Sequence, residues 1–359
     1  MGHSPVKVAW SAVLRSRHRL PPAWDQALER AKWAVRRPPA GLELAPQPQG
    51  LEPRVLIAPA NFAGQGWAWA QAITGSGWGS GVNWAFSANP VFAYSADYFQ
   101  PINVGAASRQ FQRAQFRRVV ANFQAVVAES GRPLFGKLWG HQPAKELEAL
   151  QAAGLAVAVL WHGSDVRLPS QHAASHPLSP YALPQLRHQA AAWESTARRN
   201  RRALEHLGVP QLVSTPDLLE QVPGSWWCPV VVAPGPTPGL PPLTREVPRV
   251  VHIPSNPLLK GTDLIDEPLR RLADAGRIEY IRAEGLPAAQ VRELYAEADV
   301  VADQFRLGIY GVAAVEAMAA GRLVVSDVDP ATASAVKQAT GLALPILRVP
   351  AVQLGQVLD

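Results

Sequence analysis

The chain has 359 residues, of which 48% are hydrophobic and 17% charged, and its formal net charge is +6. This composition excludes a disordered chain, and the length suits two domains rather than a single core. The single cysteine, Cys228, excludes an internal disulfide and a cysteine-based zinc cluster. The longest apolar runs, such as Leu155–Trp161, are far shorter than the ~20 residues of a membrane span, and the N-terminal segment lacks the pattern of a signal peptide. We therefore expect a cytoplasmic protein.

Most of the net positive charge lies in residues 1–50, which hold eight Lys or Arg against three Asp or Glu. We expect this segment to be a basic extension, with a helix at Trp24–Arg37 because apolar side chains recur on one side and prolines flank it. The extension is either a solvated arm or a peripheral contact with an anionic membrane. No nucleic-acid partner is expected, since the basic residues are not interleaved with a recognition motif.

Residues 51–233 are predicted to form an N-terminal α/β domain. Apolar runs typical of strands occur at 54–60, 82–87, 90–95, 132–139, 155–161 and 211–217. Helical spacing follows a glycine-bearing turn in 61–73, and recurs at 109–130, 144–154 and 193–208. Strands that alternate with helices in this way predict a parallel sheet.

Residues 234–248 contain six prolines, which exclude a helix or a central strand. We expect a stiff interdomain linker there that acts as a hinge. A second α/β domain is predicted at 249–345, and 346–359 are expected to be a tail. The whole is thus predicted to be two doubly wound, Rossmann-like domains that face a cleft, with ligands outside the carboxyl ends of the strands.

The stretch HIPSNPLLKGTD, residues 252–263, lies between a predicted strand and a predicted helix. Backbone N–H groups and the helix dipole favour an anion at such a place, and Lys260 adds a positive charge. Ser255 and Asn256 add neutral donors. The alternative is an ordinary strand–loop–helix turn with an exposed lysine.

The stretch GIYGVAAVEAMAAG, residues 308–321, holds one charged residue, Glu316, among small and apolar neighbours. Gly308 and Gly311 lie at a strand-to-helix turn, where glycine permits close approach of a ligand. A carboxylate in the following helix can accept hydrogen bonds from the two hydroxyls of a ribose. The alternative is a glutamate that is favoured there only by the helix dipole.

Two stretches of the first domain carry further candidates. WHGSDVR, residues 161–167, places His162 and Asp165 at the carboxyl end of a predicted strand, where they are candidate catalytic residues. The alternative is that Asp165 only caps a turn. NFAGQGWAWAQAI, residues 61–73, offers Gly64 and Gly66 as a weaker loop candidate. We expect no metal, because no carboxylate or histidine cluster stands out.

These stretches resemble a known family, the GT-B fold retaining glycosyltransferases of family 4. The resemblance is specific over 249–327, looser over 54–217 and absent from 1–50, and it implies that 51–233 is the acceptor-side domain. It implies that Lys260 and Gly311 hold a donor diphosphate, that Glu316 binds the ribose and that His162 lies at the transferred sugar. The remaining donor-site residues that it implies are Gly261, Glu284, Gly308 and Tyr310.

The resemblance implies a metal-independent, retaining glycosyltransferase of the hexosyltransferase type, without a cofactor. It would transfer a sugar from a nucleotide-sugar to a hydroxyl of a glycan, a glycolipid or a small molecule. Two departures from the family pattern matter. Gly308 stands where the family has the first of its two signature glutamates, and Pro254–Asn256 stand where an arginine usually precedes the lysine. The alternative is a glycosyltransferase-like nucleotide-binding or scaffolding protein without turnover.

Overall fold

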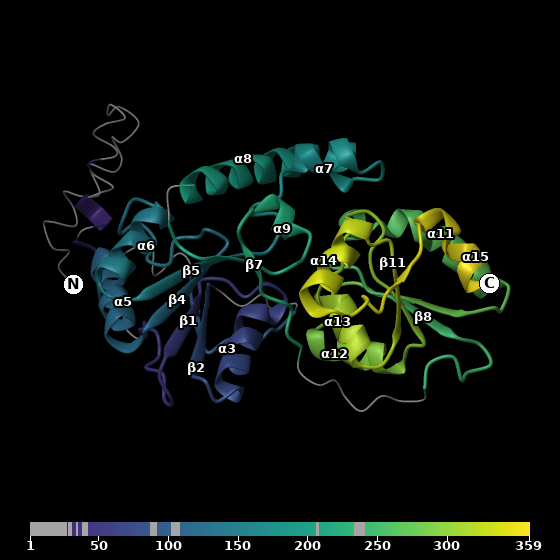
Figure 1. Ribbon diagram of the computed structural model, residues 1–359, viewed down its shortest axis with the longest axis horizontal. Coiled ribbons are helices and arrows are strands. Elements are labelled where there is room, and N and C mark those ends of the chain that lie inside the picture. Colours follow the sequence, from purple (N-terminus) through teal and green to yellow (C-terminus); the bar gives the residue numbers. More distant parts are fainter. Residues whose placement is uncertain are drawn as a thin grey trace, which may run out of the picture.

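The computed structural model describes residues 27, 31–33, 35–37, 42–86, 92–101, 108–205, 208–232 and 241–359. Within these residues the chain forms two α/β units that lie side by side, each built on its own sheet (Figure 1). All strand pairings in both sheets are parallel among the described residues. The predicted fold class, two doubly wound α/β domains, is confirmed.

The first sheet has seven strands in the described residues, in the order β3-β2-β1-β4-β5-β6-β7. Its strands are β1 (Arg54–Ala58), β2 (Ser80–Phe86), β3 (Tyr98–Gln100), β4 (Ala125–Glu129), β5 (Ala156–Trp161), β6 (Gln211–Val213) and β7 (Trp226–Trp227). The strand order reverses between β1 and β4, which is the point where doubly wound sheets open a crevice for ligands.

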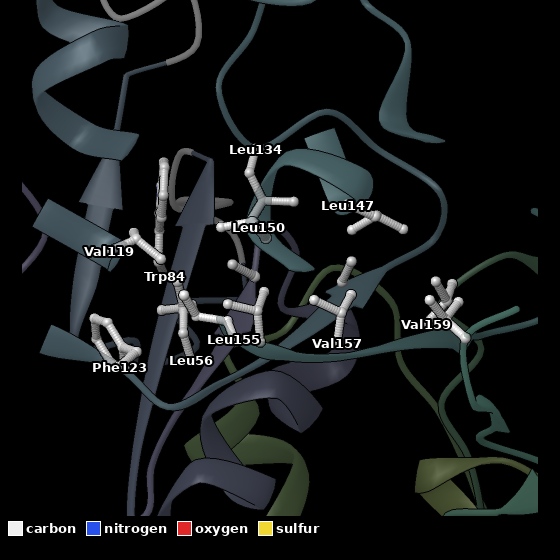
Figure 2. Close-up of a cluster of buried hydrophobic side chains, with 14 of the residues drawn as sticks. Leu56, Trp84, Val119, Phe123, Leu134, Leu147, Leu150, Leu155, Val157 and Val159 are labelled. Atoms are coloured by element: carbon white, nitrogen blue, oxygen red, sulfur yellow. The ribbon is translucent and has the colours of Figure 1, made fainter. Parts of the chain in front are cut away.

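The helices of the first domain cover both faces of this sheet (Figure 1). They are η2 (Phe62–Gly64), α3 (Gln65–Gly75), α5 (Arg109–Asn122), α6 (Pro143–Ala152), α7 (Pro169–Ser175), η3 (Pro180–Ala182), η4 (Pro184–Leu186), α8 (Arg187–Leu204) and α9 (Leu218–Gln221). Successive strand residues point to opposite faces. Leu56 accordingly packs with α5 and α6, whereas Ile57 packs with α3. Figure 2 shows the first of these two clusters, with Trp84, Val119, Leu134 and Leu150 among its labelled side chains.

The second sheet has five strands in the described residues, in the order β12-β11-β10-β8-β9. Its strands are β8 (Arg249–His252), β9 (Glu279–Arg282), β10 (Val300–Ala302), β11 (Leu323–Ser326) and β12 (Leu347–Arg348). Here the order reverses between β8 and β10. Buried His252 ties these two strands to the next helix, because Nδ1 lies 2.8 Å from the carbonyl of Ala302 and Nε2 lies 2.8 Å from the hydroxyl of Thr262.

The helices of the second domain are α10 (Pro257–Lys260), α11 (Thr262–Asp274), α12 (Ala288–Glu297), α13 (Val312–Ala319), α14 (Pro330–Thr340), η5 (Ala351–Gln353) and α15 (Leu354–Leu358). Val250 packs with α11 on one face of the sheet, and Val251 packs with α12, α13 and α14 on the other. Among the described residues, none of the helices combines the length and the apolar character that crossing a membrane requires.

The segment between β5 and β6 joins the two domains. Figure 1 shows α8 above the first sheet and α7 reaching toward the second domain. The ring of His176 contacts the carboxylate of Asp329, and Arg306 donates a 3.1 Å hydrogen bond to the carbonyl of Leu178. The predicted linker, 234–248, is described only from residue 241 on, where it has neither helix nor strand. Its role as a hinge stays a prediction.

One predicted helix was too long. Residues 109–130 divide into α5 and the buried strand β4, with a break at Phe123. The Cα positions of β4 lie between those of β1 and β5 in the sheet. Valines 126 and 127 continue the apolar spacing of the helix, so the pattern concealed a short strand in which β-branched residues are favoured.

Two predicted strands and the predicted tail also differ from the structure. Residues 132–139 form turns, and the described part of 90–95 has no strand either. The third strand of the sheet comes later, at Tyr98–Gln100. The segment 346–359 adds β12 to the second sheet, and Leu354 is buried in the second core. Half of the expected helix at 24–37 lies outside the described residues, and within the described part residues 27, 31–33 and 35 are helical.

The turns at 132–139 are held by a buried carboxyl group. One oxygen of Glu146, on α6, accepts hydrogen bonds from the backbone N–H groups of Leu134 (2.7 Å) and Phe135 (3.3 Å). Its other oxygen has no hydrogen-bond partner among the described residues, and Glu146 is fully buried. Burial raises the pKa of this carboxyl group to about 8, against the opposing effect of the two N–H groups.

We expect Glu146→Gln to make stability less dependent on pH. Between pH 4.5 and 8 the unfolded chain loses this proton while the folded chain keeps it, so wild-type stability falls as pH rises. Wild type should therefore lose roughly 3–5 kcal/mol more of its free energy of unfolding than the variant does when the pH is raised from 5 to 9, as measured by urea unfolding. Glu148→Gln, exposed on the same helix, is the matched control and should show no such gain. A parallel pH profile for Glu146→Gln and wild type would contradict the assignment.

Candidate functional site

A cavity of about 250 Å³ opens at the carboxyl ends of β8 and β10. We call it the switch-point cavity. Four predicted site residues line it: Ser255, Lys260, Gly311 and Glu316. The first domain closes it from the other side with Ala63, Phe92 and Tyr94. The backbone N–H of Ala288 also donates a 3.3 Å hydrogen bond to the carbonyl of Phe92, so this wall is attached to α12.

Lys260 is held at the cavity by a buried acid. Its Nζ contacts Oδ1 of Asp303, which follows β10, and its side chain is 14% exposed. The second oxygen of Asp303 has no hydrogen-bond partner among the described residues. Two donors of the lysine thus remain available to a ligand, because an ammonium group carries three.

The start of α13 faces the same cavity through Gly311, Val312 and Ala313. The first N–H groups of a helix have no acceptor within the helix, and the dipole makes this end positive. Together with Lys260 they form a site for an anion such as a phosphate.

Glu316 lies on α13, further along the same cavity wall. Its side chain is 18% exposed, and its nearest cation is Arg292, with Nη1 4.0 Å from Oε1. Burial raises the pKa of Glu316, and Arg292 opposes this effect. The carboxylate is therefore short of hydrogen-bond donors and can accept them from ligand hydroxyls. Burial and the charge of Glu316 both raise the pKa of the neighbouring Tyr94.

Other residues that the sequence assigned to this site are occupied elsewhere. The side chain of Asn256 accepts hydrogen bonds from the N–H groups of Leu258 and Leu259 and so caps α10. Gly261, with φ +76°, joins α10 to α11. Glu284 is exposed and pairs with Arg282 at 2.6 Å, although the adjacent Gly285 does line the cavity. Tyr310 is 6% exposed and packs in the second core.

Gly308 lies against Asp329 and not in the switch-point cavity. Its φ is +65°, and a Cβ placed on it would lie 2.2 Å from Oδ2 of Asp329. The backbone N–H of Asp329 also donates a 2.8 Å hydrogen bond to the carbonyl of Gly308. Both the backbone conformation and the contact explain why a glycine stands here.

Gly308→Ala should destabilise the protein more than Gly276→Ala does. Both glycines have positive φ, +65° and +71°, but a Cβ on Gly276 would meet nothing within 4 Å. We expect the strained backbone to lower the free energy of unfolding by about 1 kcal/mol at either site. The clash with Asp329 should lower it by roughly 1–3 kcal/mol more at Gly308, as measured by denaturant unfolding. In an Asp329→Ala background the extra loss should disappear. Equal losses at the two glycines would contradict the contact.

In the first domain, His162 forms a pair with a glutamate that the sequence analysis missed. Nε2 of His162 lies 3.0 Å from Oε1 of Glu129, and Oε2 of Glu129 accepts a 3.1 Å hydrogen bond from the N–H of Ala60. Glu129 ends β4 and is fully buried. Burial raises its pKa, and the hydrogen bond with His162 opposes this effect. The pair fixes the orientation and proton arrangement of the imidazole.

His162 lines a cavity of about 560 Å³, which we call the His162 cavity. Its ring makes an edge contact with Phe62, with centroids 5.0 Å apart. Phe62 also lines a middle cavity of about 390 Å³, and Ala63, Phe92, Tyr94 and Ser255 are shared between this middle cavity and the switch-point cavity. The three cavities are therefore adjacent, with the middle cavity between the other two. His162 lies toward one end of the series and Lys260 at the other.

Asp165 caps the turn after β5, which is the alternative that the sequence analysis left open. Its carboxylate accepts hydrogen bonds from the N–H groups of His162 (3.0 and 3.1 Å) and Gly163 (2.8 Å). Gly64, with φ +74°, begins α3, and a Cβ there would lie 2.9 Å from the ring of Tyr94. Gly66 packs against Asn83 and the carbonyl of Ala60, so its smallness serves contact between α3 and the sheet.

The arrangement can bind an anion and hydroxyl groups at one end and hold or accept a proton at the other. No group of three or more His, Cys, Asp or Glu that could hold a metal ion occurs within the described ranges. Lys260 and the start of α13 line the switch-point cavity, and His162, paired with Glu129, lines the His162 cavity.

No protein-family model and no curated protein matches the chain. Among solved structures, sucrose-phosphate synthase from Thermosynechococcus elongatus is 13% identical, with 85% of this chain and 88% of that chain covered and a TM-score of 0.48. The catalytic domain of starch synthase IV from Arabidopsis thaliana, bound to ADP and acarbose, is 10% identical, with coverages of 77% and 83% and a TM-score of 0.45. HepE from Anabaena, in complex with UDP and glucose, is 12% identical, with coverages of 85% and 88% and a TM-score of 0.44. Likeness at this level does not establish a family, so the functional conclusion depends on the site itself.

Proposed function

We propose that the protein is a GT-B type, metal-independent, retaining glycosyltransferase that uses a nucleotide-sugar. One observation carries this proposal: Lys260, the start of α13 and Glu316 line a single cavity at the carboxyl edge of a doubly wound sheet. A lysine and a helix N-terminus suit a diphosphate, and a carboxylate further along the wall suits ribose hydroxyls. The apolar lining residues, among them Ile253, Leu286 and Val291, suit a base.

The leaving group in this reaction is a nucleoside diphosphate. Lys260 and the N–H groups of α13 stabilise the charge that develops on it as the bond to the sugar breaks. The acceptor hydroxyl attacks from the face that the leaving group departs, so the configuration at the sugar is retained. His162, oriented by Glu129, lies on the acceptor side and interacts with the sugar or the incoming hydroxyl. No side chain has to act as a covalent nucleophile.

A screen against UDP, GDP, ADP and dTDP tests the donor site. A nucleotide present at about 100 times its dissociation constant should stabilise the protein by about 2.7 kcal/mol in a thermal-shift experiment. The nucleotide that binds is then offered as its sugar conjugates, and release of nucleoside diphosphate and the anomeric configuration of the product are followed. Absence of a shift with all four nucleotides would refute the donor site, and inversion at the sugar would refute retention.

A binding or scaffolding protein without turnover is the second candidate. It is favoured by two findings: the carboxylate of Asp329 fills the space beside Gly308, and Asp165 is engaged by its own loop. Nucleotide binding without release of diphosphate from any conjugate would select this candidate. Turnover that depends on His162 would exclude it.

A further inference from the structure

The turn that follows β4 has features that the proposed donor site does not use. Ser130, Gly131 and Arg132, which we call the Ser130 turn, line the His162 cavity. Ser130 has a φ of +59° and Gly131 a φ of +57°. A side chain on Gly131 would meet Trp161 at 3.1 Å and Asn200 at 3.2 Å, so the turn is pressed against the sheet and α8. A non-glycine residue in the left-handed region is uncommon and often marks a functional site.

Ser130 offers an unused polar group at this turn. The residue is 5% exposed, and its hydroxyl has no hydrogen-bond partner among the described residues. Buried hydroxyls are normally satisfied, so an orphan one that lines a cavity points to a ligand. The backbone N–H of Ser130 is already bound to the carbonyl of Leu160, at 2.8 Å, which leaves the hydroxyl as the free group.

Two arginines from different elements meet the same cavity. Arg132 lies on the turn, with its guanidinium 4.9 Å from the ring centre of Phe62, and Arg199 lies on α8. Both also line an adjoining cavity of about 520 Å³ that holds His141. Neither forms an ion pair with any carboxylate of the described ranges. Asp165, which lines this cavity, is engaged by two backbone N–H groups, and Glu129, whose pKa is raised by burial and lowered by the charge of Arg132, is bound to His162.

We propose that the Ser130 turn and Arg199 form a subsite for a phosphate monoester carried by the acceptor. Two guanidinium groups and a hydroxyl supply several donors and two positive charges, which match the three oxygens and the double charge of such a group. The aromatic rings of Phe62 and Trp193 supply contact for the body of the molecule. This inference rests on the proposed function, because it assigns the acceptor of that same reaction.

The subsite would place the anionic end of the acceptor away from the donor. Arg132 lines the His162 cavity and the middle cavity, and only the middle cavity shares residues with the one that holds Lys260. An acceptor anchored at Arg132 and Arg199 would thus extend through the middle cavity toward the donor sugar. Arg132 and Arg199 then bind the phosphate of the acceptor, and Lys260 binds the diphosphate of the donor.

The test uses phenyl phosphate, benzyl alcohol and inorganic phosphate as probes, with binding to the full chain measured by calorimetry. Phenyl phosphate should bind, and Arg132→Gln or Arg199→Gln should each weaken it about tenfold or more. Ser130→Ala should weaken it by a smaller factor. Arg202→Gln, exposed on the same helix and outside the cavity lining, is the matched control and should have no effect.

Separate readouts distinguish this inference from the donor proposal. Lys260→Ala should leave phenyl phosphate binding unchanged and remove nucleotide binding, and the two arginine variants should do the reverse. If phenyl phosphate fails to bind, or binds no more tightly than inorganic phosphate or benzyl alcohol, the subsite is wrong even where nucleotides bind. Loss of its binding only in Lys260→Ala would place the anion at the donor site and overturn the inference. Binding that responds to the arginines in a protein that takes no nucleotide would uphold the subsite and refute the donor site.

Discussion

Lys260→Ala should weaken nucleoside diphosphate binding by at least about 100-fold. A hydrogen bond between charged groups contributes about 1.5–3 kcal/mol, and removal of the ammonium also leaves the carboxylate of Asp303 beside the diphosphate without its cation. Calorimetric titration with the nucleotide identified in the screen measures the loss. Lys337→Ala, exposed on α14, should bind as tightly as wild type.

A second variant separates binding from folding. Asp303 is 1% exposed in its side chain, so Lys260→Ala alone leaves a buried charge unpaired and should destabilise the protein by roughly 3–5 kcal/mol. Adding Asp303→Asn removes that charge and should restore most of the stability. Nucleotide affinity should remain at least about tenfold below wild type, because the missing ammonium is not replaced. Wild-type affinity in the double variant would show that Lys260 only neutralises Asp303 and does not hold the ligand.

The sequence pattern was most informative in the second domain. Strands and helices there are separated by short turns, and each apolar run corresponds to one element of the structure. The sequence predicts that Lys260, Gly311 and Glu316 lie close together, because all three follow strands of one parallel sheet. The carboxyl ends of such strands share an edge of the sheet. Their assignment to donor binding remains a prediction.

Contacts between distant segments could not be predicted from local patterns. Glu129 was concealed because the apolar spacing of α5 continues into β4, and a five-residue buried strand cannot be distinguished from a helix end by periodicity. Tyr94 reaches the switch-point cavity from the other domain, so nothing near it in sequence indicates this place. Likewise the cause of a glycine at 308 lies at Asp329, which only the folded chain brings beside it.

Glu129→Gln should reduce turnover by about 100-fold or more and leave nucleotide affinity within twofold of wild type. The N–H of Ala60 requires an acceptor, so the amide oxygen of the glutamine takes that contact and its NH₂ group faces Nε2 of His162. Nε2 then has to accept a hydrogen bond from this NH₂ group, and the ring proton moves from Nε2 to Nδ1. The imidazole keeps its position, but its Nδ1 is now a hydrogen-bond donor, whereas in the wild type Nδ1 could accept a proton.

Two matched variants show whether this proton arrangement is what matters. His162→Ala should lower turnover at least as much as Glu129→Gln, and the double variant should be no worse than His162→Ala, because the two residues act as a unit. Glu146→Gln changes another buried carboxyl group of the same domain that does not contact His162, and it should leave turnover unchanged. If Glu129→Gln kept more than half of the wild-type turnover, Glu129 would only pack beneath the histidine. Additive losses would show that the two residues contribute separately, and the pair would then not be the group that orients the imidazole for the reaction.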